Sequence, residues 1–261
     1  MNLQNNGFDK NSTYFEHSLD SSGIPTVFIH GVGLDHTMWL PQKKYFHNKN
    51  VIFYDLLNHG RSKKDYKELK FNNFTEQLIQ LVNFLEIKKF NLIGFSIGAL
   101  IAQHFTSEYY EKINKLIILA SIYKRSEKQK TKVKNRYKMA LMGESITVDS
   151  INRWFNPEFL KINPDIYSYF YNILEKKNVD DFLPAYKLFV ESDDYALDFS
   201  NFHMPTLIMT GENEIGSTPE MSKMLGKQIN KSKIYIIPNA KHMATFEKAD
   251  LVNIEISKFI S

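Results

Sequence analysis

The sequence predicts an α/β fold: a mostly parallel central sheet flanked by helices, with an inserted helical lid. Short, continuous apolar runs, typical of strands buried on both faces, alternate with segments at helical spacing. Such β-α-β alternation implies parallel strands with helices on both faces of the sheet. Over residues 121–202 the buried runs vanish, and charged, aromatic-rich stretches replace them. We therefore expect a core over residues 1–120, a helical lid over 121–202, and the rest of the core over 203–261.

The apolar runs set the expected strands. Residues 1–12 are polar and predict a loose arm or the edge of a first strand. Residues 13–17 alternate as a strand does, and residues 20–23 predict a turn. The strands expected to be buried lie at residues 25–29, 50–54, 90–93, 115–120, 204–210 and 233–237.

Three helices carry recognisable termini. Asn73 is a candidate N-cap with Glu76 three positions later, as in a capping box, and the apolar residues that follow recur at helical spacing. Thr218 precedes Pro219, a residue favoured in the first turn of a helix. The closing helix is expected from about residue 247 to 260.

Composition restricts the class of protein. With 261 residues, 43% hydrophobic and 24% charged, the chain can fold as one large domain with an insertion. Its net charge of +4 is carried mostly by dispersed lysine, so a nucleic-acid partner is not expected. The basic run over residues 124–138 is interpreted as a solvated helix face, with attraction of an anionic substrate or partner as the alternative.

Several other functional classes are excluded or disfavoured. The chain has no long apolar run and no basic, apolar leader, so we expect a cytoplasmic protein without membrane contact. The absence of cysteine excludes disulfides, thiolate metal sites and a cysteine nucleophile. We expect no metal and no cofactor.

The pentapeptide from Gly94 to Gly98 follows one of the buried runs and opens a helical segment of small residues. The pattern G-x-S-x-G at such a turn places Ser96 in a strained backbone conformation, and the two glycines remove Cβ atoms that would collide with the neighbouring strand and helix. Ser96 Oγ would then stand above the carboxyl end of the sheet, near the free N–H groups of the new helix. Ser96 is therefore the candidate nucleophile.

A second glycine-flanked turn ends the first buried run. Gly31 and Gly33 on either side of Val32 let the backbone turn so that an N–H points toward a bound carbonyl oxygen. The backbone N–H groups of Val32 and Ile97 are the candidate oxyanion hole. A dinucleotide-binding turn is not expected, because G-x-G-x-x-G would need glycine where the sequence has His36.

A serine nucleophile needs a base with a pKa near 7, and histidine is that residue. Of eight histidines, only His242 follows the last expected strand, at the edge where an open parallel sheet binds its ligand. Of the others, His30 and His59 lie in early turns, His104 lies in the helix behind Ser96, and His203 precedes a strand. The sequence shows no obvious partner for His17, His36 and His47.

The third member of such a triad is an acid that accepts a hydrogen bond from the other ring nitrogen of the histidine. Glu214 lies four residues past the end of its expected strand, the usual site of that acid. The alternatives are Glu212, two positions away, and the lid aspartates Asp193, Asp194 and Asp198.

Together these motifs closely resemble the α/β-hydrolase superfamily, over essentially the whole chain outside the first dozen residues and the lid. The matching stretches are HGVG at 30–33, DxxxHGxS at 55–62, GFSIG at 94–98, GENE at 211–214, and His242. Within the superfamily, the chain looks most like the small branch that includes 3-oxoadipate enol-lactonases and pimeloyl-carrier methyl ester esterases. The order nucleophile, acid, histidine along the chain also agrees with this family.

Two positions depart from the family pattern. The family usually has aspartate where Glu214 stands, which leaves the identity of the acid open. It also usually has glycine before the catalytic histidine, where this chain has Lys241, a residue that either alters the local pKa or points away. Ser96 excludes the haloalkane dehalogenase branch, which uses aspartate as its nucleophile.

The sequence therefore predicts a serine hydrolase that cleaves a small carboxylic ester or lactone through an acyl-enzyme on Ser96. One alternative keeps the same residues but hydrolyses a carbon–carbon bond in a dienoate ketone. Another is a small-molecule-binding member of the fold whose triad is idle. A small-molecule substrate is the expected partner, and the sequence is compatible with a homo-oligomer.

Overall fold

The computed structural model describes residues 5–19 and 23–261, so the amino-terminal part of the expected arm and most of the expected turn at residues 20–23 lie outside the described residues. Its central feature is an eight-stranded sheet. The strands are β1 (Asn5–Phe8), β2 (Tyr14–Ser18), β3 (Thr26–Ile29), β4 (Val51–Tyr54), β5 (Phe90–Phe95), β6 (Ile113–Leu119), β7 (Thr206–Gly211) and β8 (Ser232–Ile237).

The sheet is mostly parallel, as the sequence predicts. Its strand order is β1-β2-β4-β3-β5-β6-β7-β8. Strands β1 and β2 form an edge with antiparallel pairing, and the six strands from β3 to β8 are parallel to one another. Because β3 and β5 are neighbours, the loops after these two strands meet at the carboxyl edge of the sheet.

Two hydrophobic cores lie on opposite faces of the sheet, and successive strand residues alternate between them. In β6, Leu116 and Ile118 contribute to one core, whereas Ile117 and Leu119 contribute to the other. A strand buried on both faces needs such a continuous apolar run, because successive side chains point in opposite directions.

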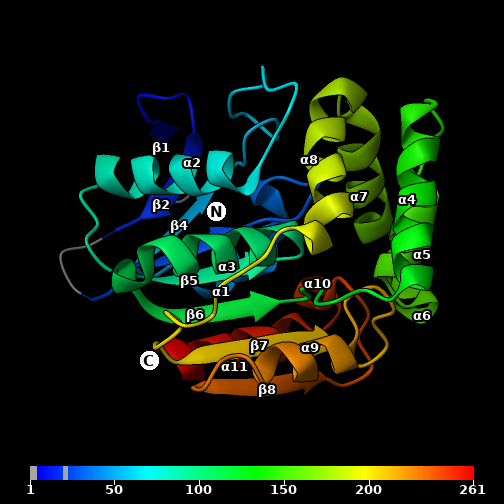
Figure 1. The fold of residues 1–261 in the computed structure, drawn as a ribbon. Coiled ribbons are helices and arrows are strands. Elements are labelled where there is room, and N and C mark those ends of the chain that lie inside the picture. Colours follow the sequence, from blue (N-terminus) through cyan, green and yellow to red (C-terminus); the bar gives the residue numbers. More distant parts are fainter. Residues whose placement is uncertain (1–4, 20–22) are drawn as a thin grey trace.

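Helices cover both faces of the sheet (Figure 1). Helices α2 (Phe71–Phe84), α3 (Ile97–Tyr109) and α9 (Pro219–Gly226) pack on one core. The other core is covered by the 3₁₀ turn η1 (His36–Trp39) and by α1 (Leu40–Tyr45), α10 (Ala244–Glu247) and α11 (Ala249–Ile260). This arrangement confirms the predicted fold class.

Five helices are inserted between β6 and β7. They are α4 (Glu127–Leu141), α5 (Thr147–Trp154), α6 (Pro157–Ile162), α7 (Pro164–Lys176) and α8 (Val179–Glu191). They gather beyond the carboxyl ends of the parallel strands (Figure 1). Arg125 and Asp193 join the two ends of this insertion, with Arg125 Nε 2.6 Å from Asp193 Oδ2.

Two helix boundaries differ from the sequence prediction. Helix α2 begins at Phe71, so Asn73 is its third residue rather than its N-cap. Asn73 Oδ1 instead accepts a hydrogen bond from the Lys70 N–H at 2.8 Å, which satisfies the cap from inside the first turn. The closing helix, expected from about residue 247, begins at Ala249 as α11, because Lys248 leaves the helical conformation at φ −133°.

The start of α9 agrees with the prediction. Thr218 is its N-cap, and the Thr218 hydroxyl accepts a hydrogen bond from the Met221 N–H. Pro219 occupies the first helical position, where its missing N–H costs no helical hydrogen bond.

Candidate active site

Ser96 occupies the sharp turn between β5 and α3. Its φ of 58° and ψ of −117° lie in a region that L-residues rarely adopt, and the side chain is buried. A Cβ on Gly94 would lie 2.1 Å from the Gly98 carbonyl oxygen, and one on Gly98 would lie 2.5 Å from the carbonyl oxygens of Ile29 and His30. The two glycines therefore allow the strand and helix to approach as closely as the turn requires, as predicted.

The predicted oxyanion donors come from the start of α3 and from the loop after β3. Ile97 follows it as the first residue of α3, whose leading N–H groups have no helical acceptor. A Cβ on Gly31 would lie 3.5 Å from Ser96 Cβ, so the loop that carries Val32 runs directly beside the serine. Among the described residues, neither the Val32 nor the Ile97 N–H has a hydrogen-bond acceptor.

Two buried histidines hold this glycine loop in place. His59 Nε2 accepts the Gly33 N–H at 3.0 Å, and His59 Nδ1–H donates to the Leu57 carbonyl. Burial lowers the pKa of His59 to about 3, so the ring is neutral at physiological pH. His30 Nε2 likewise accepts the Leu56 N–H at 2.9 Å. Both rings act as structural hydrogen-bond acceptors.

Glu214 and His242 form a buried pair. His242 Nδ1 lies 3.0 Å from Glu214 Oε2, and the two residues are 6% and 3% exposed. The other oxygen, Glu214 Oε1, accepts the N–H groups of Gly216 and Ser217. Burial alone would raise the pKa of Glu214, but the charge and hydrogen bond of His242, with the nearby charge of Arg153, lower it to about 2.

The alternative acids lie away from this pair. Among the described residues, none of Glu212, Asp193, Asp194 and Asp198 contacts His242. Glu212 is exposed and accepts the Asn239 N–H at 2.9 Å. Asp193 is paired with Arg125. Glu214 is thus the acid whose position suits the role.

Lys241 does not face the candidate site. Its Nζ donates to the Asn152 carbonyl at 3.1 Å, and its backbone N–H donates to Glu247 Oε2 at 2.7 Å. The lysine that replaces the usual glycine therefore ties the histidine loop to α5 and α10.

Ser96 and His242 line one cavity of about 230 Å³ at the carboxyl edge of the sheet. In the part of the chain that is described, no hydrogen bond joins the two side chains. The His242 ring is held by Phe95, at 4.8 Å between ring centroids, and by Trp154, at 6.2 Å. Serine–histidine contacts that are loose without substrate commonly tighten when substrate binds.

The insertion supplies most of the other cavity walls. Its contributing side chains are aromatic, aliphatic, basic or uncharged polar, and they include Gln129, Lys132, Val133, Arg136, Ile146, Ser150, Arg153, Trp154, Leu174, Lys177, Phe182, Tyr186 and Phe189. The solvated face expected for residues 124–138 holds for exposed lysines such as Lys134. It is wrong for Arg125, which is buried, and for Arg136, which is partly buried against the cavity.

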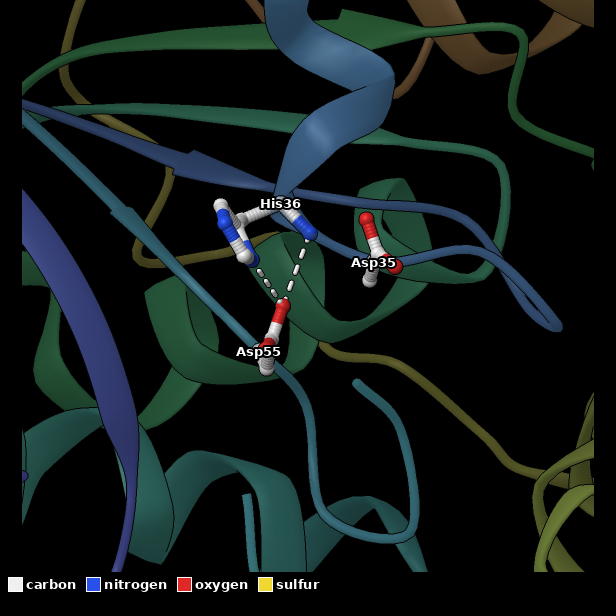
Figure 2. A group of neighbouring side chains, drawn as sticks. All are labelled: Asp35, His36 and Asp55. Atoms are coloured by element: carbon white, nitrogen blue, oxygen red, sulfur yellow. Dashed lines mark hydrogen bonds and ion pairs between the residues drawn. The ribbon is translucent and has the colours of Figure 1, made fainter. Parts of the chain in front are cut away.

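His36, for which the sequence offers no obvious partner, is the centre of a buried ionic cluster. Figure 2 shows Asp55 accepting hydrogen bonds from both the ring and the backbone N–H of His36, with Nδ1 at 2.7 Å. His36 Nε2 lies 3.0 Å from Glu16 Oε1. Burial opposes the charge, but these carboxylates raise the pKa of His36 to about 9.

Asp35, His36 and Asp55 present ligand atoms within 4.8 Å of one another, a spacing that could hold a metal ion. The potential ligand atoms already have protein partners, because His36 is bonded on both nitrogens and Asp55 Oδ2 accepts the Arg61 N–H. The Asp35 carboxylate accepts from the backbone N–H of Thr37. We interpret the cluster as a structural anchor for the loop after β4.

Within residues 5–19 and 23–261, no helix combines the length and apolar character needed to cross a membrane. The helices that surround the cavity are short and carry basic residues.

Comparison with known proteins gives a consistent family. The family model of the alpha/beta hydrolase fold matches residues 25–249. An (E)-2-((N-methylformamido)methylene)succinate hydrolase of Acinetobacter baylyi is 28% identical, covering 97% of this chain and 94% of its own. A 3-oxoadipate enol-lactonase of the same organism is 23% identical, covering 87% and 85%. The crystal structure of a hydrolase from Pseudomonas aeruginosa aligns over 100% of both chains, with a TM-score of 0.88 and 17% identity.

Proposed function

The chain belongs to the α/β-hydrolase fold family and is a hydrolase, and we propose that it cleaves a small carboxylic ester or lactone through an acyl-enzyme on Ser96. The observation that supports this most strongly is the buried Glu214–His242 pair, whose imidazole lines the same cavity as Ser96. The relatives named for a succinate derivative and for an enol-lactone support hydrolysis as the reaction class.

In the proposed mechanism, Glu214 accepts the Nδ1–H of His242, so that Nε2 is free to act as the base. His242 takes the hydroxyl proton of Ser96 as Oγ forms a bond to the substrate carbonyl carbon. The carbonyl π bond opens, and the N–H groups of Val32 and Ile97 stabilise the oxygen anion. The imidazolium then gives its proton to the leaving alkoxide as the carbon–oxygen bond breaks.

Water completes the cycle at the same carbonyl carbon. His242 takes a proton from water as the water oxygen attacks the acyl-enzyme, and it returns that proton to Ser96 Oγ when the acyl bond breaks. We propose that the insertion between β6 and β7 acts as the lid that selects the substrate, because its helices and loops together form most of the cavity wall. The cavity volume of about 230 Å³ favours a small acyl group.

The test is a screen of p-nitrophenyl esters of graded chain length, several lactones and one dienoate ketone. We expect turnover of esters or lactones that Ser96→Ala abolishes, to below about one thousandth of the parent rate. Ser107→Ala is the matched control, because Ser107 lies on the same helix α3 and, among the described residues, its hydroxyl bonds only the His104 carbonyl.

Two outcomes would contradict the proposal. Residual ester hydrolysis well above that level in Ser96→Ala would remove Ser96 from the role of nucleophile. Faster cleavage of the dienoate ketone than of any ester or lactone would favour carbon–carbon bond hydrolysis instead.

A further inference from the structure

The arginines of this chain are concentrated at the cavity. The sequence holds 33 basic residues, of which only Arg61, Arg125, Arg136 and Arg153 are arginine. The last three all line the cavity that contains Ser96. Among the described residues that line it, none is aspartate or glutamate. Arginine differs from lysine in presenting a planar, weakly hydrated fork that matches a carboxylate, so its placement here points to an anionic ligand.

Arg125 is already satisfied within the protein. Its Nε bonds Asp193 Oδ2 at 2.6 Å, and its Nη2 donates to two carbonyl oxygens and to the Ser192 hydroxyl. This guanidinium joins the two ends of the insertion and is not available to a substrate.

Arg136 and Arg153 are in the opposite situation. Arg136 Nη2 donates to Ser150 Oγ at 2.8 Å, but Arg136 Nε is buried without a partner. Arg153 Nε is also buried without a partner, and among the described residues Arg153 forms no ion pair. Burial and the neighbouring charge of Arg136 lower the pKa of Arg153. Two like charges thus line one cavity, each with a buried Nε–H that has no acceptor among the described residues.

Among the described residues, the carboxylate of Glu214 acts on Arg153 through its charge, but it forms no ion pair with either arginine. Glu214 attracts Arg153 electrostatically, yet both Glu214 oxygens are occupied, Oε2 by His242 and Oε1 by the N–H groups of Gly216 and Ser217. Guanidinium groups that are removed from water without an acceptor are costly, whereas a carboxylate placed between them would form short charge-assisted hydrogen bonds.

We propose that Arg136 and Arg153 form a carboxylate-binding subsite, and that the substrate is an ester or lactone that carries a free carboxylate beside the group to be cleaved. The identity of the cleaved bond rests on the proposed function, whereas the carboxylate subsite does not. Lys177, which also lines the cavity and donates to the Leu174 carbonyl at 2.7 Å, adds positive charge near the same wall.

The test compares two p-nitrophenyl esters of similar length. Mono-p-nitrophenyl glutarate carries a carboxylate at the end of its acyl chain, and p-nitrophenyl hexanoate is neutral. We expect the wild type to favour the glutarate ester in kcat/KM, and we expect Arg136→Gln to lower the ratio of the two values by about 10- to 100-fold, mainly through KM. Arg136→Lys keeps the positive charge but lacks the planar guanidinium group, so its ratio should lie between those of the wild type and Arg136→Gln.

Lys134→Gln is the matched control, because it removes one positive charge from an exposed site on the same helix α4. Its selectivity ratio should stay within about twofold of the wild type, since exposed charges are screened by salt. Far-ultraviolet circular dichroism of each variant checks the fold. A ratio that is unchanged in Arg136→Gln, or that falls equally in Lys134→Gln, would overturn the subsite.

Binding separates this inference from the proposed function. Glutarate should bind Ser96→Ala in calorimetry and should compete with the neutral ester in the wild type, whereas 1,5-pentanediol should do neither. Glutarate binding without any ester turnover would refute the reaction and support the subsite. Turnover of the neutral ester without competition by glutarate would support the reaction and refute the subsite. Inhibition by inorganic phosphate as strong as that by glutarate would overturn the assignment to a carboxylate.

Discussion

Replacing Glu214 by glutamine tests the proposed triad at its acid. The two backbone N–H groups of Gly216 and Ser217 converge on Glu214 Oε1. In Glu214→Gln, the amide oxygen must take this place, because an NH₂ group there would face two donors. The NH₂ group is then left facing His242 Nδ1, where the carboxylate accepted a hydrogen bond in the wild type.

The consequence is the wrong tautomer of His242. The amide donates to Nδ1, so the ring carries its proton on Nε2 and cannot accept a proton from Ser96. A comparable tautomer error in serine proteases lowers kcat by about 10⁴-fold, or about 5.5 kcal/mol. The fold should persist, since the glutamine retains the size of the side chain and the two backbone hydrogen bonds.

The assay is kcat/KM on the best ester from the substrate screen, measured from pH 5 to 9. Glu212→Gln is the matched control, because Glu212 is exposed and, among the described residues, its carboxylate accepts only the Asn239 N–H. Its activity should stay within about twofold of the wild type, as is usual for an exposed charge. Activity of Glu214→Gln above about a tenth of the wild type, or an equal loss in Glu212→Gln, would show that Glu214 is not the acid of the triad.

Three further predictions concern stability. A Cβ at Gly98 would lie 2.5 Å from two backbone carbonyl oxygens. Gly98→Ala should therefore lower the free energy of unfolding in urea by about 3 kcal/mol, whereas Gly7→Ala, whose Cβ meets nothing within 4 Å, should change it little. The pKa of His36 rises from 6.5 to about 9 on folding. Protonated His36 therefore stabilises the folded state by about 3 kcal/mol below pH 6.5, and this contribution is lost as the pH rises through 9. The stability of His36→Gln should not show this pH-dependent loss, whereas that of His47→Gln should. Glutarate at about 100 times its Kd should raise the wild-type Tm by about 5 °C and that of Arg136→Gln much less, as differential scanning fluorimetry can measure.

The sequence predicts the fold well because its signals are local. Each parallel strand is a short apolar run whose alternate residues serve two cores, and the pattern is visible without knowledge of the neighbours. The turn at Ser96 is equally local, since the two flanking glycines are required by contacts with the adjoining strand and helix. The resemblance to the α/β-hydrolases, confirmed by the family match over residues 25–249, rests on these same turns.

The features missed by sequence reasoning depend on contacts between distant elements. His36 has no visible partner in the sequence, because Glu16 comes from β2 and Asp55 follows β4. Likewise, helical spacing within residues 124–138 does not show which face turns toward the cavity, so the sequence alone does not distinguish Arg136 from the exposed lysines. The choice of arginine over lysine was the available signal, since only four arginines occur in the chain.

The proposed function depends on an activated hydroxyl at Ser96, and a fluorophosphonate probe measures that reactivity directly. We expect one covalent adduct per chain, located by mass spectrometry on the peptide that contains Ser96, formed within minutes and absent from Ser96→Ala. Labelling of His242→Asn should be slower by orders of magnitude, because the base is missing. A folded wild-type protein that stays unlabelled, or that carries the adduct on another residue, would show that Ser96 is not an activated nucleophile.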